Sequence, residues 1–548
     1  MKKFILSIGF ILFFLVQVIA QNDPMKGQDS LVLELERNEW LPESQKFKVD
    51  FPKINLTLPP KLPYFYTSDS FAHQPKMILP TLKVDNLQKP TLEKLYQGYA
   101  KISFSSLLQP SVIFNVNQGR TTNLDWGFCG NYEGLLKNYV PNSNRHYFQL
   151  EGHAGWHKEL WSFKTQLQYQ RWMFNYFGDS TYQAIQPASD SIRSNFSAFQ
   201  WNNDLIYGNS LSGFYANIPL NCIFYSDKWK NHEFHLLSNP DLSYSFQKFK
   251  LGIQGRIQNV SLKNEWKQNS RLLLEANPYG EVNMNLLKLR LGLQWMKVDS
   301  LGFILPELLI NYQVFPKQVQ AFLGIKGEGT LNSLWETKRL YPYLESNFHQ
   351  QSSITPWKIF AGGKLSVHQW SLNLMGYYKK VNHLMIIYGT SLDGILQERW
   401  VKQGYLTAIY DGAARIYGLD FSAEWKHQEY VRFSLEMNYQ NWILQNYEYN
   451  FHQPNLRLQF IGEYLLNKKF EFFSIISYIS MIRLGYLLNN SVINQKGVIL
   501  ADLKFSYRFN ENFSIFVGGN NLLNQKYFLL RDYQEIPIHG YAGIRILF

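Results

Sequence analysis

The sequence predicts an all-β protein: a transmembrane antiparallel β-barrel of about 22 strands with a proline-rich extended N-terminal arm. Three observations support this fold class. The chain begins with a segment typical of export, it has no later apolar run long enough for a membrane helix, and apolar and polar residues alternate along most of its length.

Residues 1–20 have the pattern of a secretory signal peptide. Two lysines form a short positive region, a run of apolar residues follows, and Val18-Ile19-Ala20 offers small or tolerated residues at the cleavage positions. The segment is short for a membrane span, and polar, turn-rich sequence follows it. We therefore expect export with cleavage before Gln21, in preference to a single N-terminal anchor.

The rest of the sequence contains no run of about eighteen apolar residues, the length of a membrane helix. The closest run, from Phe472 to Leu488, is interrupted by serines and by Arg483. This excludes a helical inner-membrane bundle and leaves a large soluble all-β protein or a transmembrane barrel. Tyr, Phe and Trp make up 16% of the residues, and barrels need such side chains at both membrane interfaces, so the composition favours the barrel.

Residues 21–95 are expected to form an extended arm and not a folded domain. Proline removes backbone donors and keeps the chain out of regular sheet ladders. The arm is expected either in the periplasm or inside the barrel lumen. Nine of the 21 prolines fall in it: Pro24, Pro42, Pro52, Pro59, Pro60, Pro63, Pro75, Pro80 and Pro90.

Residues 96–548 are expected to form the barrel, because alternation is the pattern of strands with two different faces. Segments of roughly nine to eleven residues suit a tilted strand that crosses the bilayer. Closure also removes the edges that such long strands would otherwise expose, which favours a barrel over a β-sandwich. The clearest alternating segments are Phe249 to Ile257, Leu287 to Trp295, Val431 to Tyr439 and Ile499 to Tyr507.

The strand number follows from the length of this region. A strand with its share of turn and loop takes roughly twenty residues, which predicts about 22 strands, or about sixteen to twenty if some loops are long. Candidate turns are Asn239-Pro240-Asp241, the pair Asn489 and Asn490, and Asn510 to Asn512.

No catalytic, cofactor-binding or metal-binding residue is predicted, and we expect no enzyme. His153 and His157 would share one face of a strand but lie about 13 Å apart, too far to hold one ion. His232 and His235 would point to opposite faces. Metalloprotease, Walker and dinucleotide-binding motifs are absent from the sequence.

The cysteines and the net charge also have ordinary interpretations. Cys129 and Cys222 are too few for a disulfide framework, and Cys222 has the apolar parity of its segment, so a packed or lipid-facing thiol is expected. A single disulfide between them stays open, because exported proteins meet oxidising conditions. The net charge of +12 is interpreted as ordinary surface lysine, with anionic solutes or lipopolysaccharide phosphates as the alternative partners. No basic cluster with interleaved aromatics indicates nucleic-acid binding.

The C-terminal end carries a resemblance to a known family. The last strand places Ala542, Ile544, Ile546 and Phe548 on one parity, which is similar to the signal by which bacterial outer-membrane barrels are recognised for assembly. Before it, the segment from Phe513 to Tyr527 resembles the penultimate hairpin of TonB-dependent receptors. The matching residues of the turn are Asn521, Leu522, Leu523, Asn524 and Tyr527.

Two internal segments, Arg415 to Trp425 and Leu372 to Ile387, also resemble receptor strands, so the likeness covers the chain from about Gly98 to its end. Receptors of this family carry a folded plug and a TonB-contacting box before the barrel. Here only the arm precedes the barrel. This combination resembles the plugless receptor-like barrels of Bacteroidetes.

The resemblance implies an outer-membrane protein of a Gram-negative bacterium that acts in passive or partner-assisted passage of solutes. The alternative is a membrane-embedded scaffold or subunit of an outer-membrane protein assembly. The expected partners are outer-membrane lipid and lipopolysaccharide, the barrel-assembly machinery and an envelope protein, with no nucleic acid and no cofactor.

Overall fold

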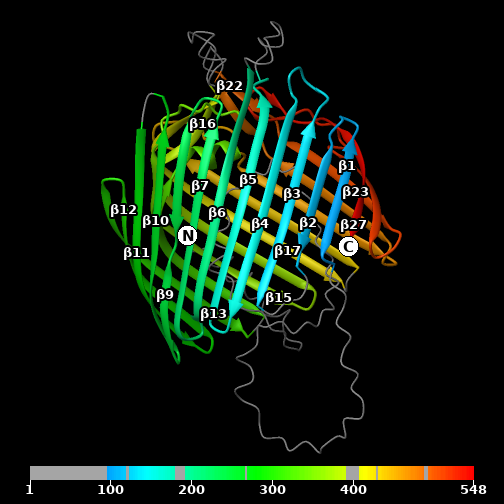
Figure 1. Cartoon of the computed structure of the whole chain (residues 1–548). Coiled ribbons are helices and arrows are strands. Elements are labelled where there is room, and N and C mark those ends of the chain that lie inside the picture. Colours follow the sequence, from blue (N-terminus) through cyan, green and yellow to red (C-terminus); the bar gives the residue numbers. More distant parts are fainter. Residues whose placement is uncertain are drawn as a thin grey trace, which may run out of the picture.

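The computed structural model describes residues 96–118, 123–178, 192–265, 268–316, 318–389, 406–427, 430–486 and 491–548. The predicted signal peptide (1–20), the predicted arm (21–95) and the candidate turn at Asn489 and Asn490 lie outside these ranges and stay predictions. Within them the chain is nearly all β, as Figure 1 shows.

The strands close into one antiparallel barrel of 22 spans, which confirms the predicted fold class. Each strand pairs with its neighbours in sequence, and the first strand pairs with the last, from Tyr99↔Leu547 to Ser105↔Tyr541. Two strands, β8 and β9, together make one span, because both pair with β7 and with β10. Closure leaves the described strands of the wall without an unpaired edge, which is the condition for a sheet that stands in lipid.

The spans of the first half of the barrel are β1 (Gly98–Ser105), β2 (Ser111–Asn117), β3 (Leu124–Leu135), β4 (Arg145–Lys158), β5 (Trp161–Asn175), β6 (Arg193–Asn209), β7 (Ser212–Asp227), β8 (His232–Ser238) with β9 (Asp241–Phe246), β10 (Phe249–Lys263), β11 (Gln268–Met284) and β12 (Leu287–Val298).

The second half contains β13 (Leu301–Phe315), β14 (Val319–Leu331), β15 (Ser352–Val367), β16 (Trp370–Gly389), β17 (Leu406–His427), β18 (Val431–Ile443), β19 (Leu456–Leu466), β20 (Phe470–Ile479), β23 (Val498–Arg508), β24 (Phe513–Asn520) and β27 (His539–Leu547). Five described elements are not strands of the barrel wall. They are the helix α5 (Leu334–Leu340), the short pair β21 (Ile482–Tyr486) with β22 (Val492–Gln495), and the short pair β25 (Phe528–Leu530) with β26 (Tyr533–Gln534). No helix in the described ranges is long and apolar enough to span a membrane.

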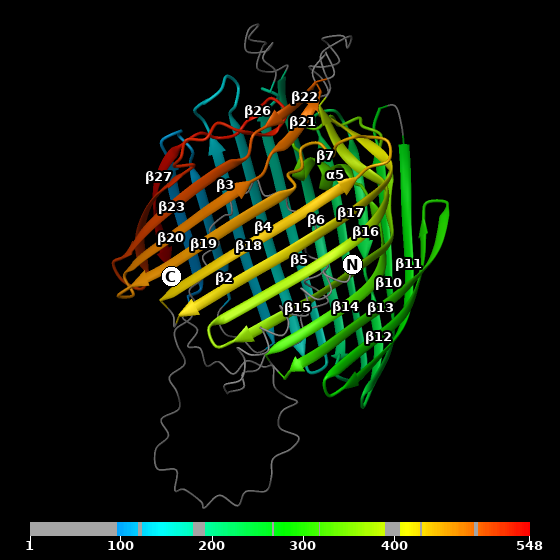
Figure 2. The same ribbon diagram turned by 180° about the vertical axis from the view of Figure 1, so that it is seen from behind.

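The two ends of the barrel differ in their connections. At one end the strands are joined by short turns, such as 159–160, 210–211 and 368–369. At the other end the connections include 332–351 and 521–538, and α5, β22 and β26 lie there (Figure 2). Outer-membrane barrels have short periplasmic turns and longer extracellular loops. We call these ends the short-turn end and the long-loop end.

The outer wall is apolar, as the alternation predicts. On β12 the exposed side chains are Leu291, Leu293 and Trp295, whereas Arg290 and Gln294 are buried on the inner face. The exposed large apolar side chains of the neighbouring strands have the same outward parity. A wall of this kind is stable only when lipid covers it, so the chain is an integral protein of the outer membrane.

Several strands are longer than the sequence pattern predicted. β16 has 20 residues and β17 has 22, about twice the length that a tilted strand needs to cross the bilayer. The extra length lies toward the long-loop end, where the wall continues beyond the membrane. In this region the wall surrounds the loops.

One turn prediction was wrong and one is confirmed. Asn239-Pro240-Asp241 does not reverse the chain, because β8 and β9 continue in one direction between β7 and β10. Proline lacks a backbone donor, so it breaks the ladder here without ending the span. Asn510 to Asn512 does form the turn between β23 and β24, where the Asn510 side chain accepts bonds from the Asn512 and Phe513 amides at 2.9 and 2.7 Å.

The seam of the barrel joins the two ends of the described chain. The Phe548 carbonyl accepts hydrogen bonds from the Gln97 and Gly98 amides, each 2.7 Å long. A Cβ at Gly98 would lie 2.0 Å from the Phe548 ring, so only glycine lets this ring lie across β1. The predicted apolar parity of the last strand is confirmed, since Ile546 and Phe548 are exposed on the outer face.

Candidate functional site: a polar lumen under a loop cap

The inner wall is polar and its groups are bonded to one another across strands. On β4, the Glu151 carboxylate accepts from Gln166 Nε2 at 2.6 Å, Gln168 Nε2 at 3.0 Å and Gln149 Nε2 at 3.3 Å. Three amide donors hold this carboxylate in place, which also limits the cost of withdrawing it from water. The wall therefore presents fixed polar groups to anything inside the barrel.

A second group on the inner wall is a buried ion pair. Arg290 Nε lies 2.9 Å from Glu307 Oε1, and both side chains are only 9% exposed. The guanidinium lies 3.8 Å from the centre of the Tyr279 ring, and the Tyr279 hydroxyl donates to Asp241 at 3.1 Å. Side chains on β9, β11, β12 and β13 are thus linked by one polar network, which fixes the register of these strands in the low-dielectric wall.

At the long-loop end, apolar side chains form a packed cluster across the mouth. We call this cluster the loop cap. Its most buried aromatic is Phe196 on β6, and Trp335 on α5 is the bulkiest side chain that is fully buried. The buried members are Phe174, Tyr176, Phe177, Ile192, Phe196, Ala198, Ile223, Tyr225, Leu334, Trp335, Tyr341, Tyr343, Leu344, Phe348, Ile387, Leu406, Ala408 and Tyr533.

The members of the loop cap come from opposite sides of the barrel. Phe196 lies on β6, Ile387 lies on β16, and Tyr533 belongs to the connection between β24 and β27. In a barrel of 22 spans, β6 and β16 are nearly opposite. Contacts between them through α5 and residues 341–348 therefore cross the mouth and do not merely line one wall. Tyr343 stacks on Tyr533 with ring centres 3.7 Å apart.

A carboxylate on the wall holds the start of α5. Glu233, on the inner face of β8 and 3% exposed, accepts from the Leu334 amide at 2.7 Å and the Trp335 amide at 3.1 Å. The Ser333 hydroxyl accepts from the Glu336 amide at 3.1 Å as the N-cap. Together these acceptors satisfy helix amides that would otherwise be buried without partners. Glu233 therefore fastens the loop cap to the wall.

The end of α5 is fastened from the other side of the barrel. Gln453, in the connection between β18 and β19, donates to the Tyr341 hydroxyl at 2.6 Å. Burial raises the pKa of Tyr341 to about 12, so the hydroxyl is neutral at ordinary pH. The neighbouring His452 is bonded through Nδ1 to the Ile387 carbonyl at 2.9 Å, and burial lowers its pKa to about 4. This loop is therefore locked to both α5 and β16.

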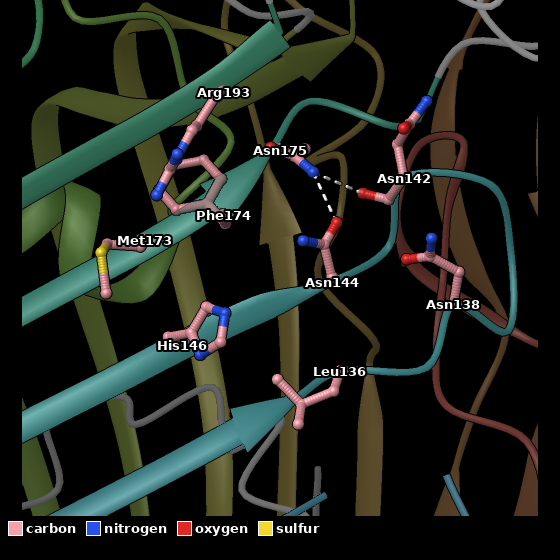
Figure 3. A pocket seen from close by; sticks show the side chains of 9 residues that line it. All are labelled: Leu136, Asn138, Asn142, Asn144, His146, Met173, Phe174, Asn175 and Arg193. Atoms are coloured by element: carbon pink, nitrogen blue, oxygen red, sulfur yellow. Dashed lines mark hydrogen bonds between the residues drawn. The ribbon is translucent and has the colours of Figure 1, made fainter. Parts of the chain in front are cut away.

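A pocket of about 380 Å³ lies on the rim of the long-loop end (Figure 3). Its polar side chains His146 and Arg193 have the parity of the outward-facing Trp156 and Phe199, so they face the outside of the barrel. Its lining residues are Leu136, Asn138, Asn142, Asn144, His146, Met173, Phe174, Asn175 and Arg193. Two of its polar side chains are bonded to each other, because Asn175 donates to the Asn144 side chain at 2.6 Å.

The histidine pairs considered in the sequence have structural roles. His157 lies 3.2 Å from Asp125 and 2.8 Å from Ser162 on the inner wall. His232 is exposed while His235 is buried, which confirms that they point to opposite faces. Within the described ranges, no three His, Cys, Asp or Glu residues are grouped as a metal site would require.

The cysteines are free thiols in this structure. Cys129 shares the inward parity of Glu133 on β3, whereas Cys222 has the outward parity of Phe224 on β7. Since their side chains lie on opposite faces of the wall, the disulfide that the sequence left open does not form.

The receptor-like segment near the C-terminus has a folding role. Asn521 is 1% exposed, and its side chain donates to the Gln525 and Ile536 carbonyls at 2.9 and 3.2 Å. Tyr527, also 1% exposed, packs against Val498 and Leu500. The segment therefore folds the long connection between β24 and β27 back onto the wall.

These features define an integral outer-membrane β-barrel whose outer mouth is covered by its own loops. No protein-family model matches the sequence, and no curated protein matches it. Solved structures do match the fold. The FrpB iron transporter from Neisseria meningitidis superposes with a TM-score of 0.63 at 10% identity, over 83% of this chain and 82% of that chain.

Two receptors have the same fold. The ferric enterobactin receptor PfeA from Pseudomonas aeruginosa gives a TM-score of 0.60 at 11% identity, over 82% of this chain and 80% of that chain. The siderophore receptor PirA from Acinetobacter baumannii gives 0.61 at 11% identity, with the same coverage. At this identity the likeness shows the fold alone. It confirms a receptor-like outer-membrane barrel.

Sequence reasoning missed the residues of the loop cap. One signal could have found its helix: Ser333 and Glu336 have the spacing of a capping box, just before a segment without alternation. Glu233 carries no such signal. It lies about a hundred residues earlier on an ordinary alternating strand, and only the closed barrel brings it to α5.

Proposed function

We propose that this chain is a receptor-like transport barrel that passes solutes through its polar lumen when the loop cap opens. One observation carries the proposal. The inner wall is lined by polar side chains that are hydrogen-bonded or ion-paired to one another, and an apolar cap crosses the mouth above them. A barrel used only as an anchor needs neither feature. The likeness to iron and siderophore transporters supports the same class of function.

The finer parts of the proposal come from the sequence. We take residues 21–95 as an arm that stands in place of a plug, as in the plugless barrels of Bacteroidetes. A partner protein would then assist the passage of solutes, as a plug does in the receptors. The role is not enzymatic, in keeping with the transport receptors that share the fold. Arg193 and His146 on the outer rim suit contact with lipopolysaccharide headgroups, and the barrel-assembly machinery is the partner that the C-terminal strand is expected to meet.

A swelling assay tests the proposal. The purified chain is placed in liposomes, and the influx of uncharged sugars is followed by light scattering. The matched variant replaces 332–351 by a short glycine–serine turn, and both proteins are also made without residues 21–95. We expect slow swelling for the intact chain and fast swelling once the cap segment is removed. A folded barrel that gives no swelling in any of the four forms contradicts transport.

The interlocked loops favour a second candidate, a scaffold or subunit of an envelope assembly. Three connections of the barrel hold one another through α5, Gln453 and Tyr533, and such a surface can serve as a fixed platform. Purification in mild detergent with mass spectrometry of co-eluting proteins distinguishes the two. Recovery as a lone monomer that also passes sugars contradicts the scaffold.

A further inference from the structure

Three lysines face one another in a row on the inner wall. Lys326 on β14 is the register partner of Lys358 on β15, and Lys358 is the partner of Lys379 on β16. They share the inward parity of the buried side chains Phe322 and Phe360. Side chains that are directly opposite on neighbouring strands have Cβ atoms about 5 Å apart. The three ammonium groups therefore line a single row across three spans.

Like charges directly opposite one another destabilise a sheet. Elsewhere the inner wall of this barrel places cations next to carboxylates, such as Arg508 with Glu471 at 3.3 Å and Arg290 with Glu307 at 2.9 Å. In the row, lysine faces lysine twice. The row thus brings like charges together across three neighbouring spans.

The surroundings keep the lysines together and leave them turned to the lumen. Lys358 Nζ lies 5.0 Å and Lys379 Nζ 5.9 Å from the centre of the Tyr377 ring, so this ring attracts both ammonium groups. Two carboxylates, Glu328 and Asp420, are near enough to act on Lys358. Lys326 and Lys379 also act on Lys358 by charge repulsion, and an anion between the three ammonium groups would be attracted by each of them. All three lysines are partly exposed.

We propose that Lys326, Lys358 and Lys379 form a binding site for a small oxyanion, a phosphate or a carboxylate solute, on the lumen wall. Lysine rings and rows select anions in other pores by the same electrostatics. The bound anion accepts charge-assisted hydrogen bonds and removes the repulsion within the row. This inference deepens the proposed function, because it names the class of solute, and it rests on a lumen that solutes can reach.

The test is an equilibrium binding measurement on the full chain in detergent at low salt. Titration calorimetry with inorganic phosphate and, separately, with citrate distinguishes phosphate from carboxylate solutes. The variants are Lys326→Gln, Lys358→Gln and Lys379→Gln, singly and together. The matched control is Lys250→Gln, since Lys250 also lies on the inner wall above a tyrosine ring, 5.8 Å from the centre of Tyr215.

Each replaced lysine should weaken binding by about tenfold, since each removes one charge-assisted contact. The control should bind like the unmodified chain. Absence of binding by the unmodified chain, or equal loss in the control, overturns the proposal. Because binding is measured without transport, its failure is separate from a failure of the swelling assay.

A second measurement needs no variant and so does not depend on their folding. The unmodified chain is treated briefly with acetic anhydride, with and without phosphate, and the acetylated lysines are quantified by mass spectrometry. Phosphate should slow the acetylation of the three lysines of the row and leave Lys250 unaffected. Equal protection of all four lysines, or of none, contradicts a localised site.

Discussion

Replacing Glu233 by glutamine should loosen the loop cap without unfolding the barrel. The carboxylate accepts from two α5 amides, at 2.7 and 3.1 Å, and is almost fully buried. Glutamine offers one acceptor oxygen in place of two, so one of the two buried α5 amides loses its acceptor. A buried donor left without a partner costs about 1–3 kcal/mol. A loss of about 2 kcal/mol raises the population of detached α5 about thirtyfold.

Hydrogen exchange measured by mass spectrometry on the peptide that contains α5 reports this population, because exchange there needs only local opening. The control is Glu436→Gln, an exposed glutamate on the inner face of β18. We expect exchange of the α5 amides to rise by about thirtyfold in Glu233→Gln only. Unchanged exchange in a folded Glu233→Gln barrel refutes the reasoning, as does an equal rise in the control.

Three further predictions concern the loop cap and the wall. Burial lowers the pKa of His452 to about 4, below the ordinary value near 6.5, so its neutral form stabilises the cap above pH ~6.5. That contribution falls by up to about 3 kcal/mol between pH ~6.5 and ~4. The opening of the cap, measured by hydrogen exchange and corrected for the slower intrinsic exchange rate in acid, should therefore increase as the pH falls. His452→Gln should flatten this pH profile, whereas the exposed His232→Gln should not. Trp335→Ala removes a fully buried ring and should destabilise the cap by about 3–5 kcal/mol, seen as faster liposome swelling; swelling at the unmodified rate would count against a gating role. Glu307→Gln leaves the Arg290 guanidinium buried without its counter-charge, so the barrel should lose about 3–5 kcal/mol and unfold at a lower temperature in gel-shift assays, unlike the more exposed Glu424→Gln.

The wall of the barrel could be predicted because its pattern is local. Each strand repeats with a period of two, so Leu291, Leu293 and Trp295 indicate an outer face without knowledge of their neighbours. The turn prediction at Pro240 was wrong because it, too, used only the local sequence. An Asn-Pro-Asp sequence is typical of a turn, but here β7 and β10 pair with the chain on both sides of the proline and keep it straight.

The loop cap could not be predicted because its contacts join distant residues without periodicity. Phe196 meets Trp335, and Tyr343 stacks on Tyr533, across separations that only the closed barrel brings together. The lysine row depends on register in the same way. Lys326, Lys358 and Lys379 look like ordinary inward residues until the pairing of β14, β15 and β16 places them side by side.

The central claim, that the loop cap closes the lumen, is tested most directly by locking the cap. Two cap residues, Leu344 in the connection between β14 and β15 and Leu406 at the start of β17, are bridge partners, and such partners lie about 5 Å apart, within the range of a disulfide. In a chain with Cys129→Ser and Cys222→Ser, the pair Leu344→Cys and Leu406→Cys is introduced, and single-channel current is recorded in planar bilayers. We predict silence when the pair is oxidised and discrete openings after reduction. The same current in both states would contradict the account.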